Sequence, residues 1–280
     1  MKKFTTLALT LGLVSTILSG CGGTSTSSST SSQTKETLIV GMECGYAPFN
    51  WSEVSSTSTN YPIANSAGSY ADGYDVQIAI KIANALDREL VIQKVDWEGL
   101  IPAVQSGSID IIIAGMSDTE DRRVNVDFTS AYYTSTHVLV VRKDSAFASA
   151  TSIDDFAGAT IVGQKGTLYD DLIDQMNGVI HAEPIEDVPT IIANVNAQVS
   201  DGTILELPVA KAVIATNPNL KYIEFSSGNG FDVLEEDKAV AIAIGKNRTD
   251  LLNSIDNVLA QISETERQSL MDGAIERQPQ

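Results

Sequence analysis

The sequence of 280 residues has few cysteines, histidines and basic side chains. It contains two cysteines, two histidines and 18 lysines and arginines against 36 aspartates and glutamates, which gives a net charge of −18 at pH 7. Such an excess of negative charge repels nucleic acids and anionic lipid headgroups. With so few imidazoles and thiols, neither a zinc site nor any other metal or cofactor is expected. P-loop, nucleophile-elbow and metalloprotease motifs are also missing from the sequence.

One apolar run at the N-terminus indicates export. Lys2 and Lys3 precede an apolar stretch over residues 7–18, which ends shortly before Cys21. A basic start, an apolar segment and small residues at its end are typical of a signal peptide. A membrane-spanning helix needs roughly 20 apolar residues, and this run is shorter and interrupted by Thr and Ser, so a transmembrane anchor is disfavoured.

The segment Leu18-Ser19-Gly20-Cys21 resembles a bacterial lipobox, in which the signal is cut before a cysteine that is then acylated. The resemblance implies a signal peptide over residues 1–20, lipidation of Cys21, and a protein anchored by lipid to the extracytoplasmic face of the cell membrane. Residues 22–34 are almost entirely Ser, Thr and Gly, which cannot bury enough apolar surface to fold. Residues 21–36 are therefore predicted to be a flexible linker.

From Thr37 onward, segments with the character of strands and helices alternate, and a second, similar series begins near Ser152. The strand-like segments are residues 37–42, 90–95, 110–114, 159–163, 203–205 and 238–244. The helix-like segments are residues 100–105, 152–156, 167–176, 249–262 and 264–275, one helix capped by Asp75, and one with Pro208 in its first turn. This alternation predicts two α/β lobes with mainly parallel sheets. Residues 52–71, rich in Ser, Thr and Asn, are predicted to be an exposed, mobile loop with no assigned function.

Several motifs occur in order along the chain. They are residues 41–49 (GMECGYAPF), 73–76 (GYDV), 96–103 (DWEGLIPA), 105–107 (QSG), 110–116, 119–122 and 127–133 (DFTSAYY), followed by 163–167 (GQKGT) and 201–210. Together they resemble family 3 of the bacterial solute-binding proteins, the polar amino-acid receptors of ABC importers. The resemblance implies the two-lobed type II periplasmic-binding-protein fold, with two α/β lobes joined by two hinge strands. Lobe 1 is expected to comprise residues 37–133 and 239–280, and lobe 2 residues 134–238.

The residues around Arg122 suit a ligand carboxylate. Gly115 ends an apolar strand, and the capping-box spacing of Ser117 and Glu120 predicts the start of a helix, where free backbone N–H groups favour an anion. Arg122 could grip the same carboxylate through two parallel hydrogen bonds. The alternative is a surface arginine paired with Glu120 or Asp121. The resemblance favours binding, so Gly115, Ser117 and Arg122 are predicted to contact the ligand.

Two residues of the second lobe are further candidates. Thr167 has capping-box spacing to Asp170, and the resemblance implies that Thr167 donates to the ligand carboxylate. Glu206 follows an apolar strand, at the end where α/β folds place ligand contacts. Members of the family usually carry Asp there, which binds the α-ammonium group, so Glu206 keeps the charge on a side chain one methylene longer. Asp201 is expected to be a turn residue or a cap.

Aromatic residues supply the expected side-chain subsite. Tyr46 and Trp97 match aromatic positions that line the cleft in the family, where flat rings can enclose the ligand side chain and attract a cation. Phe49 is expected in the core. Tyr132 and Tyr133 are expected to pack at the hinge rather than to touch the ligand.

Glu43 bears on ligand identity. It matches a position that is often acidic in relatives that bind basic amino acids, and a buried carboxylate requires a cationic or strongly donating partner. This favours arginine, lysine or ornithine. Gln164 could equally bind an amide, so glutamine stays open. Cys44 is expected to be a small residue of the pocket wall rather than a reactive thiol.

The sequence therefore predicts a monomeric, non-enzymatic lipoprotein that captures a free L-amino acid and delivers it to the permease of an ABC importer, which works with a cytoplasmic ATPase. A receptor for glutamine or another polar amino acid is the alternative. Since some relatives on this fold are periplasmic enzymes such as cyclohexadienyl dehydratases, a dehydratase is a remoter possibility. A surface adhesin or sensor that has lost importer coupling is another.

Overall fold

The structure is a computed structural model that describes residues 35–279. The predicted signal peptide, Cys21 and most of the predicted linker lie outside the described residues. None of the helices in the described part has the length and apolar character needed to cross a bilayer.

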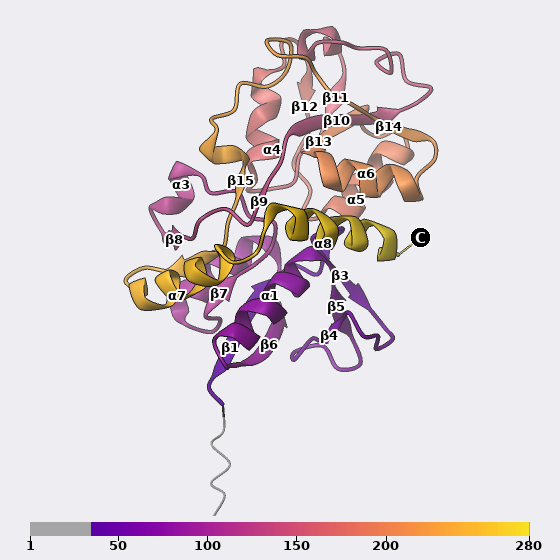
Figure 1. Cartoon of the computed structure of the whole chain (residues 1–280). Helices are drawn as coiled ribbons and strands as arrows, with labels where there is room; N and C mark the ends of the chain where they lie inside the picture. The colour runs from indigo at the N-terminus through magenta and orange to yellow at the C-terminus, as the bar shows by residue number, and fades with distance from the viewer. Residues whose placement is uncertain (1–34, 280) are drawn as a thin grey trace, which may run out of the picture. The chain divides into compact units, whose positions relative to one another are not determined.

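The first of two five-stranded sheets has the strand order β6-β1-β7-β16-β8 (Figure 1). Its strands are β1 (Thr37–Met42), β6 (Glu89–Lys94), β7 (Ile111–Ile112), β8 (Val126–Phe128) and β16 (Ala243–Gly245). The helices of this part of the chain are α1 (Tyr74–Ala85), α2 (Leu100–Ser106), α3 (Glu120–Arg123), α7 (Thr249–Leu259) and α8 (Glu264–Arg277), with the 3-10 turn η1 (Trp97–Gly99). α1 packs against β6, α7 and α8, and α2 packs against β1 and β7.

The second sheet has the order β12-β11-β13-β10-β14. Its strands are β10 (His137–Arg142), β11 (Thr160–Ile161), β12 (Ile180–His181), β13 (Gly202–Glu206) and β14 (Leu220–Ile223). The helices around it are α4 (Leu168–Asp171), α5 (Val188–Asn196) and α6 (Leu207–Thr216), with the 3-10 turns η2 (Ile153–Phe156), η3 (Leu172–Gln175) and η4 (Glu236–Lys238). Pro208 lies in the first turn of α6, as predicted, where its missing N–H costs no helical hydrogen bond.

The chain passes between the two sheets twice. It crosses from β8 to β10 through β9 (Tyr133–Thr134) and returns from β14 to β16 through β15 (Ala239–Val240), and β9 and β15 pair antiparallel with each other. The structure thus confirms the predicted fold class, two α/β lobes joined by two hinge strands. We refer to the part around the first sheet as lobe 1 and the part around the second as lobe 2.

The prediction of mainly parallel sheets is wrong. β1 is parallel to β6 and β7, and β11 is parallel to β12 and β13, but β16 runs antiparallel to β7 and β8, and β10 antiparallel to β13 and β14. β10 and β16 are the strands that the chain enters directly from a hinge strand. They therefore join their sheets without the helical crossover that parallel neighbours require.

The segment over residues 52–71 is not the structureless loop that its composition predicts. Residues of this segment belong to a four-stranded sheet of order β2-β3-β5-β4. Its strands are β2 (Gly45–Tyr46), β3 (Asn50–Glu53), β4 (Tyr61–Pro62) and β5 (Tyr70–Asp72). Ala64 N–H donates to the Ile92 carbonyl over 2.8 Å, and the Asn65 side chain accepts from Lys94 N–H and donates to its carbonyl. The segment therefore covers the exposed edge of β6, where unpaired backbone groups would otherwise invite association with another strand.

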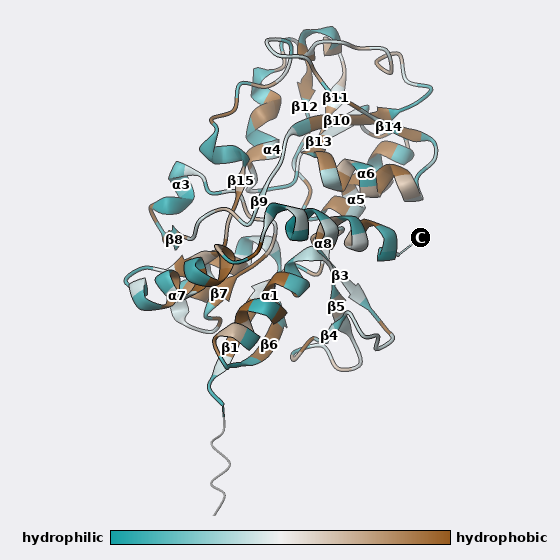
Figure 2. Cartoon of the chain, in the orientation of Figure 1, coloured by the Kyte–Doolittle hydropathy of each residue, from teal (hydrophilic) through white to brown (hydrophobic). Residues whose placement is uncertain are grey.

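Hydrophobic residues are concentrated in the strands and in parts of the helices, whereas α3 and much of α8 are hydrophilic (Figure 2). One buried cluster surrounds the first sheet and continues into lobe 2 through residues such as Val188 and Leu205, and a second cluster lies within lobe 2. Phe49 is fully buried, as predicted. Tyr132 is also fully buried and stacks on Tyr74, at a centroid distance of 5.8 Å, which agrees with packing beside the hinge rather than with ligand contact.

Candidate ligand-binding site

A small cavity between the lobes brings together eight of the nine residues predicted to bind the ligand. It is lined by Glu43, Tyr46, Trp97, Gly115, Ser117, Arg122, Gln164, Thr167, Leu168 and Tyr169. The cavity volume is about 10 Å³, close to the space that one water molecule requires. An amino acid is larger, so the lobes must separate, or side chains must shift, before one can enter.

Arg122 contacts both lobes. Its Nη1 donates to the Ser117 carbonyl over 2.8 Å and its Nη2 to the Gly166 carbonyl over 3.3 Å, while the guanidinium lies 5.1 Å from the centre of the Trp97 ring. The Trp97 indole N–H donates to the same Gly166 carbonyl over 3.0 Å. Among the described residues, no carboxylate forms an ion pair with Arg122, so the alternative of a surface arginine paired with Glu120 or Asp121 is not what the structure shows.

The prediction that Ser117 caps the helix carrying Arg122 is wrong. Ser117 forms a β-bridge with Val240 of the hinge, which keeps the chain extended until Thr119. Thr119 is the cap and accepts from Arg122 N–H over 3.4 Å. The helix α3 has only four residues, so its dipole adds little to anion binding. The guanidinium must supply most of the positive charge at this end of the cavity.

A glycine is required at position 115. Gly115 has φ +62°, and a Cβ atom there would lie 2.9 Å from the Tyr46 ring. Its N–H donates to the Tyr132 hydroxyl over 3.1 Å, and that hydroxyl donates to the buried carboxylate of Asp75 over 2.7 Å. Asp75 lies inside the first turn of α1, after Gly73 at the N-cap, so the prediction that Asp75 caps this helix is wrong. The carboxylate instead fixes the backbone beside the cavity.

Glu43 and Gln164 meet across the cleft. Gln164 Nε2 lies 3.3 Å from each carboxylate oxygen of Glu43 and also donates to the Glu186 carbonyl over 3.0 Å. Burial raises the pKa of Glu43 to about 7; the Gln164 hydrogen bond and the charge of Lys94 oppose this, and Asp187 and Asp96 raise the pKa further. The site therefore combines a buried carboxyl group with nearby negative charge, an environment that a cationic group would stabilise.

Glu206 is buried behind two tyrosines. Its exposed fraction is 1%, and its Oε1 accepts hydrogen bonds from Tyr46, over 3.0 Å, and from Tyr169. Burial raises the pKa of Glu206 to about 7, and the two tyrosine hydrogen bonds lower it. The other oxygen, Oε2, is buried without a hydrogen-bond partner among the described residues. Of the predicted ligand residues, Glu206 alone does not line the cavity.

Tyr169 is not among the ligand residues predicted from the sequence. It is buried in the first turn of α4, two residues after Thr167, and lines the cavity. The start of a helix predicted to open onto the ligand is the signal that could have identified it. Thr167 is the N-cap residue of α4, as its spacing predicted, but its hydroxyl donates to the Gln164 carbonyl over 2.7 Å rather than closing a capping box with Asp170.

Cys44 is separate from this cavity. Burial raises the pKa of its thiol to about 12, which opposes formation of the reactive thiolate. Its side chain forms part of the wall of another hollow, of about 560 Å³, together with residues of α5 and α6. It is a wall residue, as expected, but of a different pocket.

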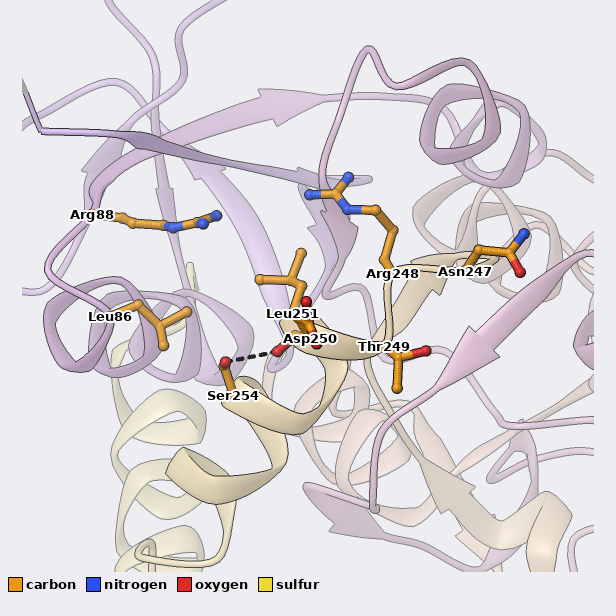
Figure 3. Close-up of a pocket in the computed structure, with 8 residues that line it drawn as sticks. All are labelled: Leu86, Arg88, Asn247, Arg248, Thr249, Asp250, Leu251 and Ser254. Atoms are coloured by element: carbon orange, nitrogen blue, oxygen red, sulfur yellow. Dashed lines mark hydrogen bonds between the residues drawn. The ribbon is translucent and has the colours of Figure 1, made fainter.

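A third hollow, of about 530 Å³, lies at the start of α7 (Figure 3). Arg88 and Arg248 lie on either side of it, with Leu251 between them. Arg88 pairs with Glu36 over 3.1 Å and Arg248 with Asp110 over 3.3 Å. Because both guanidinium charges are already balanced, this hollow is a weaker candidate for ligand binding than the small cavity between the lobes.

Two α/β lobes, paired hinge strands and a polar cavity between the lobes define a two-lobed solute receptor. Residues 38–272 match the bacterial extracellular solute-binding proteins, family 3, and the chain belongs to this family. The arginine-binding extracellular protein ArtP of Bacillus subtilis is 27% identical over 269 residues, with 94% of each chain covered. A probable histidine-binding protein of Campylobacter jejuni is 30% identical over 82% of this chain and 85% of its own.

Solved structures agree with this assignment. The arginine-bound form of truncated ArgBP from T. maritima superimposes with a TM-score of 0.67 at 30% identity, covering 81% of this chain and 96% of its own. The substrate-binding protein of an amino acid ABC transporter gives a TM-score of 0.72 at 27% identity, covering 86% of this chain and 100% of its own. The chain is thus an extracytoplasmic amino-acid-binding protein of the ABC-transporter class. It is not an enzyme, because these relatives are binding proteins, and the dehydratase alternative is set aside.

Proposed function

We propose that this protein is a lipid-anchored receptor that captures a basic L-amino acid, with arginine, lysine and ornithine as the favoured ligands, and delivers it to the permease of an ABC importer. The main support for the proposal is the burial of the Glu43 carboxyl group in the wall of the cavity. Glu43 is 8% exposed, with Asp96 and Asp187 close enough to raise its pKa. A cationic side chain would stabilise the charged form of Glu43 and balance the neighbouring negative charge.

The opposite requirement is met at Arg122. An amino acid presents a carboxylate as well as cationic groups, and Arg122 is the guanidinium that lines the cavity. In the proposed complex the ligand carboxylate takes the guanidinium bonds now made to the Ser117 and Gly166 carbonyls. Ser117 and Thr167, both buried, lie in the same wall and supply further donors. The ligand then spans the cavity from Arg122 to Glu43.

The aromatic residues Tyr46 and Trp97 favour a ligand with a cationic side chain. One face of the Tyr46 ring stacks on Phe49, with centroids 5.6 Å apart and an interplanar angle of 9°. The Trp97 ring holds the Arg122 guanidinium at cation–π distance. A ligand guanidinium or ammonium entering between these rings would meet a similar attraction. The similarity to an arginine-binding protein of Bacillus subtilis and to arginine-bound ArgBP from T. maritima supports the same ligand class.

Glutamine is the second candidate, because Gln164 already donates an amide hydrogen to Glu43. A glutamine side chain could replace that donor without carrying a charge.

A thermal-shift screen decides between basic amino acids and glutamine. The screen uses residues 35–280, which form one compact unit, and tests the twenty standard amino acids, ornithine and cystine. A ligand at about 100 times its Kd adds roughly 2.7 kcal/mol of stability. Shifts with arginine, lysine or ornithine support the proposal, and a shift with glutamine alone refutes the basic preference.

The remaining parts of the proposal concern residues 1–36 and the lobes. We propose that residues 1–20 are a signal peptide, that Cys21 is acylated and holds the protein at the membrane, and that residues 21–36 tether a monomeric receptor. Lobe 1 would then comprise residues 37–133 and 239–280, and lobe 2 residues 134–238. In producing cells, Cys21→Ala should release the protein into the soluble extracytoplasmic fraction, whereas Cys44→Ala should leave it with the membrane. Membrane retention of the Cys21 variant would contradict lipid anchoring.

A further inference from the structure

We infer that Tyr169 contacts the ligand's α-ammonium group directly and that Glu206 acts through the tyrosine hydroxyl rather than by direct contact. The inference rests on the proposed function, in which the cavity binds an amino acid. It concerns a residue that lies two positions beyond the motif of residues 163–167.

The main evidence is the arrangement of Tyr46, Tyr169 and Glu206 around the cavity. Tyr46 and Tyr169 line the cavity and Glu206 does not, yet both hydroxyls donate to the same Oε1 atom of Glu206. The two phenols therefore lie between the carboxylate and the ligand space. Glu206 is one methylene longer than aspartate, and its carboxylate is held by these two bonds while only 1% of the residue is exposed.

A phenol in this position is an acceptor for a cation. A hydroxyl that donates its hydrogen to a carboxylate keeps its lone pairs for another donor. Burial raises the pKa of Tyr169, and the Tyr46 and Ser117 hydroxyls, which already interact with Tyr169 in this way, lower it. In the proposed complex the ammonium group therefore takes the place of the Ser117 hydroxyl. The negative charge of Glu206 polarises the O–H bond and makes the phenol oxygen a better acceptor, as in other buried hydrogen-bond chains. An ammonium group carries three donors, so it can reach the Tyr169 oxygen while its remaining hydrogens bond elsewhere.

Proximity to Arg122 indicates which ligand group is involved. In an amino acid the α-ammonium is attached one carbon away from the carboxylate, so it must bind close to the guanidinium. Tyr169 and Arg122 both line the cavity, and Arg122 bonds the Gly166 carbonyl, three residues before Tyr169, whereas Glu43 is bonded by the Gln164 side chain. Tyr169 therefore serves the α-ammonium, and Glu43 serves the far end of the side chain.

The packing around Tyr169 fits this role. The His137 ring lies against it, with centroids 5.5 Å apart, and His137 is opposite Glu206 in the β10–β13 pairing. Burial lowers the pKa of His137 to about 4, and Lys238 lowers it too, so the ring is neutral at pH 7. A neutral imidazole supports the phenol without competing with an ammonium group for the charge of Glu206.

The test compares two ligands that differ only in the α-amino group, L-arginine and 5-guanidinopentanoate, by calorimetric titration of the wild-type protein and Tyr169→Phe. Hydrogen bonds to charged groups predict a loss of roughly 10- to 100-fold for arginine. The affinity for 5-guanidinopentanoate should change by less than about threefold. Tyr222→Phe, which removes a hydroxyl from β14 outside the cavity, is the matched control and should bind both ligands like the wild type.

A double-mutant cycle with Glu206→Gln separates action through the tyrosine from direct contact. If Glu206 acts through Tyr169, the two substitutions are coupled, and the double variant loses less arginine affinity than the product of the single losses. Additive losses would show direct contact of Glu206 and overturn the inference. Unchanged arginine binding by Tyr169→Phe, or equal losses for both ligands, would overturn it as well. If the wild type binds no amino acid, the proposed function fails and the inference fails with it.

Discussion

The Tyr46 hydroxyl donates a 3.0 Å hydrogen bond to the carboxylate of Glu206, although 160 residues separate the two in the sequence. Tyr46 belongs to β2 of lobe 1 and Glu206 ends β13 of lobe 2. The bond therefore crosses the cleft, as do Gln164 to Glu43, Arg122 to Gly166 and Lys165 to Glu98. Because polar contacts of this kind hold the lobes together around the cavity, removing them singly tests what each contributes to binding.

Arg122→Ala should weaken amino-acid binding by about 2–5 kcal/mol, because a desolvated ligand carboxylate would lose its charged partner. Arg123→Ala is the matched control. Arg123 is the next residue of α3, is exposed, and pairs with Asp118 over 2.6 Å instead of facing the cavity. Calorimetric titration of both variants decides the matter. An Arg122 variant that binds within twofold of the wild type would disprove the carboxylate assignment.

Binding of a basic amino acid should weaken as the pH falls from 8 to 6. Glu43 has a pKa of about 7 because it is buried, and a cationic ligand requires its charged form. Below that pKa each binding event must first remove a proton, so the Kd should rise by a factor approaching tenfold per pH unit. Glu43→Gln should bind more weakly at pH 8 and show a flatter pH profile. An unchanged profile in this variant would mean that Glu43 does not meet the cation.

Glu43 should also make the ligand-free protein less stable at neutral pH than at mildly acidic pH. Its folded-state pKa is raised from 4.5 to about 7, so the folded protein binds the proton more tightly than the unfolded chain. The resulting stability is fully present below pH 4.5 and is lost as the pH rises through 7. We expect this to amount to on the order of 1–3 kcal/mol.

Urea unfolding of wild-type protein and Glu43→Gln at pH 5 and pH 8 measures this contribution. The difference in unfolding free energy between the two pH values should be smaller in the variant. Glu276→Gln controls for the overall charge of the chain. Glu276 is exposed on α8, so this substitution removes one negative charge but no buried carboxyl group. Equal pH differences in wild type and Glu43→Gln would contradict the raised pKa.

Lys165 and Glu98 form an ion pair between the lobes, with Nζ 2.7 Å from the Glu98 carboxylate and 3.5 Å from that of Glu186. Their side chains are 44% and 49% exposed, so the pair contributes only about 0.2–1 kcal/mol. Glu98→Gln should therefore speed ligand release up to about fivefold at low salt and much less at 0.5 M salt. Stopped-flow measurement of dissociation checks this. The exchanged pair Glu98→Lys with Lys165→Glu should restore the slow rate when it is combined with Glu186→Gln, which removes the carboxylate that would otherwise face a second one at position 165. Faster release that persists in the exchanged pair would point to packing rather than charge.

Much of the fold and site follows from local sequence. The residues Glu43, Tyr46, Trp97 and Arg122, which the motifs singled out, line one cavity, since Glu43 directly follows β1, Tyr46 ends β2, Trp97 begins η1 and Arg122 belongs to the short helix α3. Glu206 was placed at the correct strand end, but its burial behind Tyr46 and Tyr169 depends on residues more than 30 positions away. Local patterns carry no information about such contacts.

The remaining errors have the same origin. Ser117 has the spacing of a helix cap, but its bridge to Val240 overrides that local preference. The composition of residues 52–71 predicts a loop, yet backbone bonds to β6 order part of it. Antiparallel pairing of β10 and β16 follows from the two hinge crossings, which no short segment specifies. In each case a partner distant in sequence determines the structure.

Calorimetric titration shows whether the protein is a receptor for basic amino acids. It compares residues 35–280 of the wild type with the Glu43→Gln variant and uses L-arginine and L-glutamine as ligands. We expect saturable one-to-one binding of arginine by the wild type, a marked loss of arginine affinity in Glu43→Gln, and weaker or absent binding of glutamine. Tight glutamine binding without arginine binding, or arginine binding that is indifferent to Glu43, would contradict a receptor for basic amino acids.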